Sequence, residues 1–114
     1  ATQLSWYNLD HGLLEYRSGR CQAALALCDA ALKSGDPYCR ATASLVYAMA
    51  AKRIEGDLGA RPRYQEAMAK LPALRSGVSQ DPTWNSLNLS IFELLLDEAK
   101  PLFEAPAAVG GQAP

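Results

Sequence analysis

The chain lacks three features that mark large classes of protein: an excess of one charge, a long apolar run and a cysteine framework. Eleven Lys and Arg residues stand against twelve Asp and Glu residues, giving a net charge of −1, whereas general nucleic-acid binders carry a basic excess. No apolar run approaches the length needed to cross a bilayer. We therefore expect neither a nucleic-acid partner nor a membrane partner.

The cysteines are few and odd in number. Cys21, Cys28 and Cys39 have no close pairing typical of a disulfide framework, and they fit a reducing compartment such as the cytoplasm. No basic segment followed by an apolar one opens the chain, so no secretory signal is indicated. Because the sequence opens on Ala1 and not on Met, we expect a processed chain or a piece of a longer protein.

Catalytic and metal-binding patterns are also missing. There is one histidine, His11, and neither a Gly-x-Ser-x-Gly nor a phosphate-binding loop. The spacings of His11 and the three cysteines match no zinc-ligand pair. Acidic residues cluster near the C-terminus, but carboxylates on a single helix are typical of a solvated face; they are Glu93, Asp97 and Glu98. We expect no cofactor, no metal and no enzyme activity, and an enzyme with an unrecognised site is the least favoured alternative.

What the sequence does have is helical periodicity. The 114 residues, 49% apolar and 20% charged, suit one globular domain, and no strand-like alternation persists. Apolar residues at three- and four-residue spacing predict an all-α fold. The expected helices cover about residues 3–17, 20–34, 37–55, 62–71 and 82–103.

The predicted ends of these helices rest on a few residues. Gly19 is suited to ending the first helix, and Asp36 and Asp81, each followed by Pro, are expected N-caps. Residues 55–62 are expected as a long break, and Pro72 is expected to bend or end the fourth helix. Residues 105–114 have no periodicity and are predicted to be a flexible tail.

Small residues recur with a shift of 36 positions. The shift aligns Gly12 with Ala48, Ala24 with Ala60, Cys28 with Tyr64 and Ala31 with Ala67. Large side chains would push two packed helices apart, so small residues at matching places predict closely packed helix pairs. The pattern of helix, break and helix therefore occurs twice.

The first unit resembles the tetratricopeptide repeat, whose pattern has a glycine, an alanine, an aromatic, a second alanine and a terminal proline. Those slots are filled by Gly12, Ala24, Cys28, Ala31 and Pro37, whereas Asn8, His11 and Glu15 depart from the pattern. The match covers about residues 5–71. It implies a right-handed α-α superhelix within residues 1–104: repeat one at about 3–36, repeat two at about 37–72 and a C-terminal capping helix at about 82–103.

A second resemblance concerns the C-terminal half. The runs "RYQEAMAKL" and "WNSLNLSIFELLLDEAKPLF" look like the end of the helical-repeat tails of large bacterial signalling proteins of the serine/threonine kinase type. The resemblance implies that the last helix closes the array, and its apolar set comprises Trp84, Leu87, Ile91, Leu94, Leu95 and Leu102. Such a cap is needed because the last helix pair would otherwise leave an apolar face in water.

The tetratricopeptide resemblance also implies a site. The first helix of each pair lines a concave groove, and the groove residues would be Trp6, Leu9, Leu13, Tyr16 and Arg17, then Thr42, Leu45, Met49, Lys52 and Arg53. This apolar floor with a basic rim suits a peptide or partner helix that carries an acidic group. Leu9 and Leu13 replace the polar residues of a carboxylate clamp, which disfavours a chaperone-tail receptor.

Two alternatives remain open at this stage. The groove residues can instead be core residues that pack against the fifth helix, because apolar residues at helical spacing usually lie in a core. The function we expect is a protein-interaction module. Its alternative is a structural module that self-associates as a homo-oligomer, or docks on its own parent chain, through an apolar face at the N-terminal end of the stack.

Overall fold

The computed structural model describes residues 2–104, residue 2 by its backbone alone, and the predicted tail 105–114 lies outside this range. The elements are α1 (Thr2–Arg17), α2 (Cys21–Ala31), α3 (Pro37–Glu55), α4 (Asp57–Ser76), the short 3-10 helix η1 (Gly77–Ser79) and α5 (Pro82–Phe103). No strand occurs within residues 2–104, which confirms the all-α prediction. No helix in this range is long and apolar enough to cross a membrane.

Two of the predicted helix boundaries are confirmed with their physical cause. The backbone N–H groups of Gly19 and Arg20 donate to the carbonyls of Tyr16 and Glu15, at 3.0 and 2.8 Å, while Gly19 has a positive φ of 85°. This pair of hydrogen bonds is the Schellman motif, which satisfies the last carbonyls of α1. At the start of α3, the Asp36 carboxylate accepts from the N–H of Tyr38 at 2.8 Å, as an N-cap does.

Helix α4 corrects two predictions. The expected break over residues 55–62 shrinks to Gly56 alone, whose φ of 85° and ψ of −166° turn the chain sharply between α3 and α4. The helix also continues through Pro72 to Ser76. A proline inside a helix removes one backbone hydrogen bond, but α4 is held by packing along its length through the buried side chains of Ala60, Tyr64, Ala67 and Leu74.

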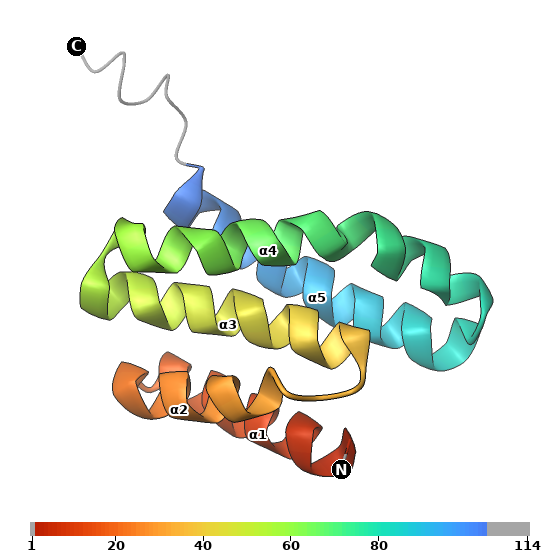
Figure 1. Ribbon diagram of the computed structural model, residues 1–114, viewed down its shortest axis with the longest axis horizontal. Coiled ribbons are helices and arrows are strands. Elements are labelled where there is room, and N and C mark those ends of the chain that lie inside the picture. Colours follow the sequence, from red (N-terminus) through yellow and green to blue (C-terminus); the bar gives the residue numbers. More distant parts are fainter. Residues whose placement is uncertain (1, 105–114) are drawn as a thin grey trace.

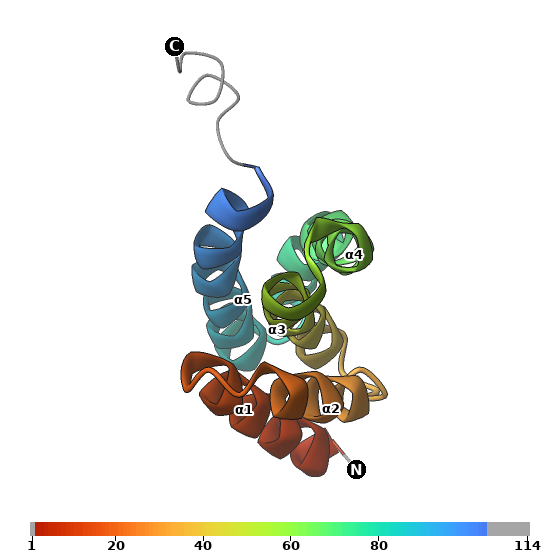
Figure 2. The same ribbon diagram turned by 90° about the vertical axis from the view of Figure 1, so that its left-hand side faces the viewer.

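Helix α3 lies at the centre of the molecule. It packs against each of α1, α2, α4 and α5, and in the end-on view of Figure 2 it lies between α1 and α5 on one side and α2 and α4 on the other. Figure 1 shows α4 and α5 following its length, with the first hairpin beneath. One buried cluster draws on all five α-helices, so these helices share a single core.

The repeated small residues lie where the helices approach most closely. A Cβ added to Gly12 would lie 3.0 Å from the Cys28 Sγ and 3.4 Å from the Leu27 Cβ, so α1 approaches α2 too closely there for a larger side chain. All eight residues aligned by the 36-residue shift are buried. The predicted close packing is confirmed at Gly12 in the first pair, and in the second pair Ala48, Ala60 and Ala67 are buried.

Candidate interaction surface between helices α1 and α5

Most of the predicted groove floor is buried. Leu9, Tyr16 and Met49 are almost fully enclosed, as are Thr42 and Leu45 of α3. Because buried side chains offer no contact to a partner, these residues do not form an open floor in this structure. Burial favours the alternative that they are core residues, with α5 packed on α3 beside them.

The predicted basic rim is largely engaged by groups of the same chain. Arg17 donates to Glu98 of α5 at 2.8 Å, and Lys52 donates to Asp57 at 2.9 Å. The Arg53 guanidinium lies 4.4 Å from the centre of the Tyr16 ring. The charge left to attract an acidic partner is therefore small, and the acidic group expected of the partner has little support in the geometry.

Trp6 and Leu13 are the remaining predicted residues, and both are partly buried against the core. Trp6 lies in a shallow depression that it shares with Asp36 and with Trp84 and Asn88 of α5. About three turns further along α1, Arg17 reaches Glu98. Side chains of α1 and α5 thus come near one another at two places, one around Trp6 and Trp84 and one at Arg17 and Glu98.

Helix α5 has two apolar faces. The buried face consists of Phe92, Leu95, Leu96, Ala99 and Phe103. The second face is exposed, and we name it the α5 stripe; it consists of Trp84, Leu87, Ile91, Leu94 and Leu102. Of the apolar set noted for this helix in the sequence, only Leu95 is buried.

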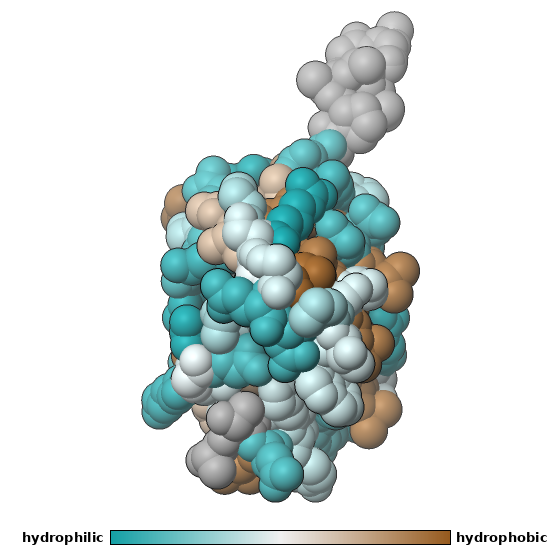
Figure 3. Space-filling view, turned by 90° about the vertical axis from the view of Figure 1, so that its right-hand side faces the viewer, coloured by the Kyte–Doolittle hydropathy of each residue, from teal (hydrophilic) through white to brown (hydrophobic). Residues whose placement is uncertain are grey.

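The α5 stripe has the spacing of a helix-packing seam. Trp84, Leu87, Ile91 and Leu94 follow one another at intervals of three, four and three residues, which places them on one side of a helix. Trp84 is 62% exposed and Leu94 is 70% exposed. In Figure 3, apolar residues gather along the edge of the molecule on which α5 lies.

Sequence reasoning missed this exposure, although a signal was present. The leucine-rich run of α5 contains two sets of apolar residues at helical spacing, one through Phe92 and Leu96 and one through Trp84 and Leu94. A helix at the edge of a small domain buries only one face. Two such sets on the last helix therefore indicate that one of them stays uncovered.

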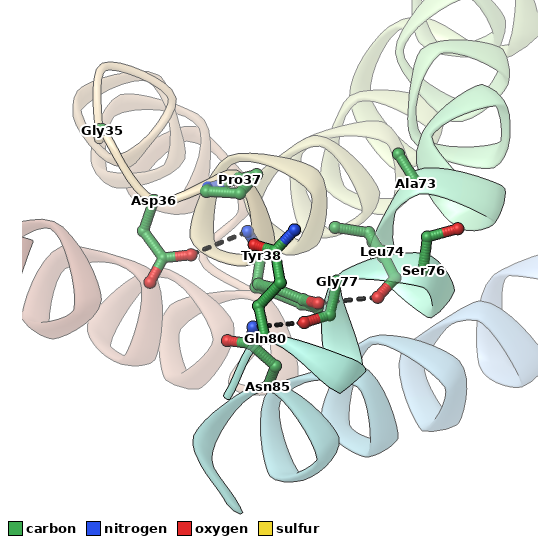
Figure 4. A pocket seen from close by; sticks show the side chains of 10 residues that line it. All are labelled: Gly35, Asp36, Pro37, Tyr38, Ala73, Leu74, Ser76, Gly77, Gln80 and Asn85. Carbon is green, nitrogen blue, oxygen red and sulfur yellow. Dashed lines mark hydrogen bonds between the residues drawn. The ribbon is translucent and has the colours of Figure 1, made fainter. Parts of the chain in front are cut away.

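A separate pocket of about 740 Å³ lies where α3 begins and α4, η1 and α5 meet (Figure 4). Two of its polar side chains are paired within the protein: the Tyr38 hydroxyl donates to the Leu74 carbonyl at 2.6 Å, and the Asn85 amide donates to the Gly77 carbonyl at 2.8 Å. A Cβ on Gly77 would lie 2.6 Å from the Tyr38 hydroxyl oxygen. The glycine thus allows the close approach between α3 and η1.

The cysteines behave as core residues. All three are free thiols and buried, and burial raises the pKa of the Cys28 thiol to about 12 and that of Cys39 to about 11. A thiol with a raised pKa is a poor nucleophile and metal ligand at neutral pH. Within residues 2–104, no group of three His, Cys, Asp or Glu side chains could hold a metal ion.

Comparisons with protein-family models, with curated proteins and with solved structures give no match to this chain.

Proposed function

We propose that the chain is a non-enzymatic protein-interaction module that binds a helix of another protein on the surface formed by α1 and α5. The observation that carries the proposal is the α5 stripe, whose apolar side chains lie in water at the spacing of a helix seam. Soluble monomers rarely expose contiguous apolar patches of several hundred Å², and such patches mark interaction sites.

We also propose a tetratricopeptide-like superhelix as the scaffold. The order of contacts supports it: α3 packs on both helices of the first hairpin, and α5 packs on both helices of the second. Helix α5 thus repeats the relation of α3 to the hairpin before it, as in a stacked repeat array. The buried alanines at equivalent places in both hairpins add to this support.

The position of the surface follows from that scaffold. Helices α1, α3 and α5 are the first members of successive pairs, and this is the side on which the family resemblance places partner binding. Here α5 lies over the part of the groove that Met49 would have lined, so the partner is met by the outer side of α5 together with Trp6 and Leu13 of α1. The binding residues move from the predicted floor to the α5 stripe.

The cellular setting remains part of this proposal. Three free, buried cysteines support a reducing compartment such as the cytoplasm. The two sequence runs at 63–71 and 84–103 support a place at the end of a larger bacterial signalling protein of the kinase type. Determining the residues that flank Ala1 and Pro114 in the full gene product tests that placement.

The binding proposal is tested with two synthetic helix-forming peptides that share a leucine seam at three- and four-residue spacing. One peptide carries lysines beside the seam and the other carries glutamates. We expect at least one of them to bind the protein, measured by fluorescence anisotropy of the labelled peptide, and to lose binding to L87E/L94E. The proposal fails if neither peptide binds, or if the double variant binds as well as the parent protein while keeping its helical circular dichroism.

A second candidate function is self-association through α1. Leu4, Tyr7 and Leu14 are exposed on its outer side at intervals of three and seven residues. They lie at the N-terminal end of the stack, where a preceding repeat or a second copy would pack. Sedimentation equilibrium over a wide concentration range tests this candidate, with Y7E/L14E as the variant that should abolish any dimer and a concentration-independent monomer as the contrary result.

A further inference from the structure

We propose that the occupant of the α5 stripe is an amphipathic helix with basic residues beside its apolar seam. This inference rests on the proposed function and adds the chemistry of the partner. Three observations carry it: the shape of the stripe, the charges around it and the way those charges are already paired.

The shape of the stripe selects a helix. The residues from Trp84 to Leu94 extend over about 15 Å of helix at 1.5 Å per residue, and their spacing is that of positions a and d of a heptad. Such a seam interlocks with side chains of a second helix laid beside it. An extended peptide would place alternate side chains on opposite sides and would leave half of them without contact.

The charges around the stripe are mainly acidic. On α5, no charged residue occurs between Pro82 and Phe92, whereas Asp97 and Glu98 follow within one turn of Leu94. On the side of α1, Asp36 shares the depression that holds Trp6 and Trp84. Together with Asp81 at the start of α5, these carboxylates lie near both ends of the stripe.

Three basic residues lie near the stripe, Arg17, Arg53 and Lys100, against four carboxylates, and Lys100 follows Asp97 by three residues on α5. Arg17 is held by Glu98 at 2.8 Å, and Arg53 lies over the Tyr16 ring. Within residues 2–104, Asp97 takes part in none of the ion pairs. A lysine or arginine on the partner, placed beside its seam, would therefore meet an unpaired carboxylate at Asp97.

The same charges argue against two other occupants. A second copy packed through parallel α5 helices would place Asp97 and Glu98 beside their counterparts, and like charges so close are unfavourable. A second copy packed antiparallel would set them against the uncharged half of α5, which offers them no cation. An acidic partner helix would meet the same carboxylates with the same sign of charge.

The two peptides described above test this inference separately from the proposed function. We expect the lysine-flanked peptide to bind about fivefold to tenfold more tightly than the glutamate-flanked one, the size produced by two or three exposed charge pairs. The preference should shrink at 0.5 M salt, because salt screens exposed charges. In D97K the preference should fall, and the exposed position of Asp97 makes this variant safe for folding; D97N should give an intermediate preference.

The contrary outcomes are distinct. Equal or tighter binding of the glutamate-flanked peptide overturns the basic partner but leaves the stripe as a docking surface. If D97K leaves the preference for the lysine-flanked peptide unchanged, the basic partner is also overturned. If sedimentation shows a dimer that L87E/L94E abolishes, the occupant is a second copy and the inference is wrong. If neither peptide binds, the proposed function itself is wrong.

Discussion

Helices α3 and α5 show opposite relations between side-chain size and burial. Helix α3 is rich in alanine and is buried on almost every side, with Ala41, Ala43, Ser44, Ala48, Ala50 and Ala51 among its enclosed residues. Helix α5 carries more leucine than any other helix here, yet three of its large apolar residues are more than half exposed, namely Trp84, Leu87 and Leu94.

The difference is explained by position in the stack. Helix α3 has neighbours on both sides, and small side chains allow four helices to approach it. Helix α5 is the last of the described helices and packs on α3, α4 and η1. Within residues 2–104, the exposed apolar residues of α5 have no helix packed over them, so their presence indicates a role outside the core. Four predictions test this comparison, in order of decreasing effect.

The largest effect concerns two adjacent leucines of α5. Leu95 is 5% exposed and Leu94 is 70% exposed. We expect Leu95→Ala to lower the free energy of unfolding by about 2–5 kcal/mol, since it opens a cavity in the core. Leu94→Ala should change it by less than about 0.5 kcal/mol. Urea unfolding followed by circular dichroism measures both, and equal losses would mean that the stripe is core.

The second effect concerns the crowded surroundings of α3. Ala48 is fully buried, so Ala48→Leu should destabilise the fold by about 1–3 kcal/mol through overpacking. Ala69 on α4 is exposed, and Ala69→Leu is the matched control with little expected change. Thermal unfolding of both variants tests the prediction. A neutral Ala48→Leu would show that α3 has more room than its burial indicates.

The third effect concerns the corner between α3 and α4. Gly56 has a backbone conformation that residues with a Cβ rarely adopt, and we expect Gly56→Ala to lose at least about 1 kcal/mol of stability. Gly35 has open space around a Cβ and no positive φ, so Gly35→Ala serves as the control. Should both alanines leave the melting temperature unchanged, the sharp turn after α3 is not required.

The smallest effect is a pH dependence where α3, α4 and α5 meet. Asp57 pairs with Arg61 at 2.6 Å and Lys52 at 2.9 Å, and these hydrogen bonds, that of Arg61 first, lower the pKa of Asp57 to about 2. Since the folded pKa lies below the ordinary value of 3.8, the pair stabilises the fold above about pH 4 and loses this contribution as the pH falls through 2.

Carbon-13 NMR of the Asp57 carboxyl measures this pKa directly. The stability difference between the parent protein and Asp57→Asn should also shrink between pH 4 and pH 2. A carboxyl that titrates near 3.8, or a difference that does not change with pH, would show that the two cations do not stabilise the ionised form.

Much of the scaffold could be predicted because local rules decide it. The caps at Asp36 and Asp81 and the glycine at 19 act within a few residues, and the small residues at Gly12 and Ala24 repeat at a fixed period. The full extent of α4 could not be predicted, because packing on α3 outweighs the breaking tendency of Pro72.

The site could be predicted only in part. The family resemblance placed Trp6 and Leu13 in a groove; in the structure Trp6 shares a depression with Trp84, and Leu13 packs against the core. Helical spacing could not show that Tyr16 and Met49 are enclosed, because their burial depends on how α5 packs across α3. The same tertiary packing decides which of the two apolar sets of α5 faces the core.

The most direct test of the central claim, that the α5 stripe is uncovered and available in the free protein, is the exposure of Trp84. The chain has two tryptophans, so Trp6→Phe leaves Trp84 as the only indole reporter. We predict that acrylamide quenches its fluorescence almost as readily as that of a free indole, and that the lysine-flanked peptide protects it. A Trp84 already protected without peptide, or quenched equally with and without bound peptide, would contradict the account.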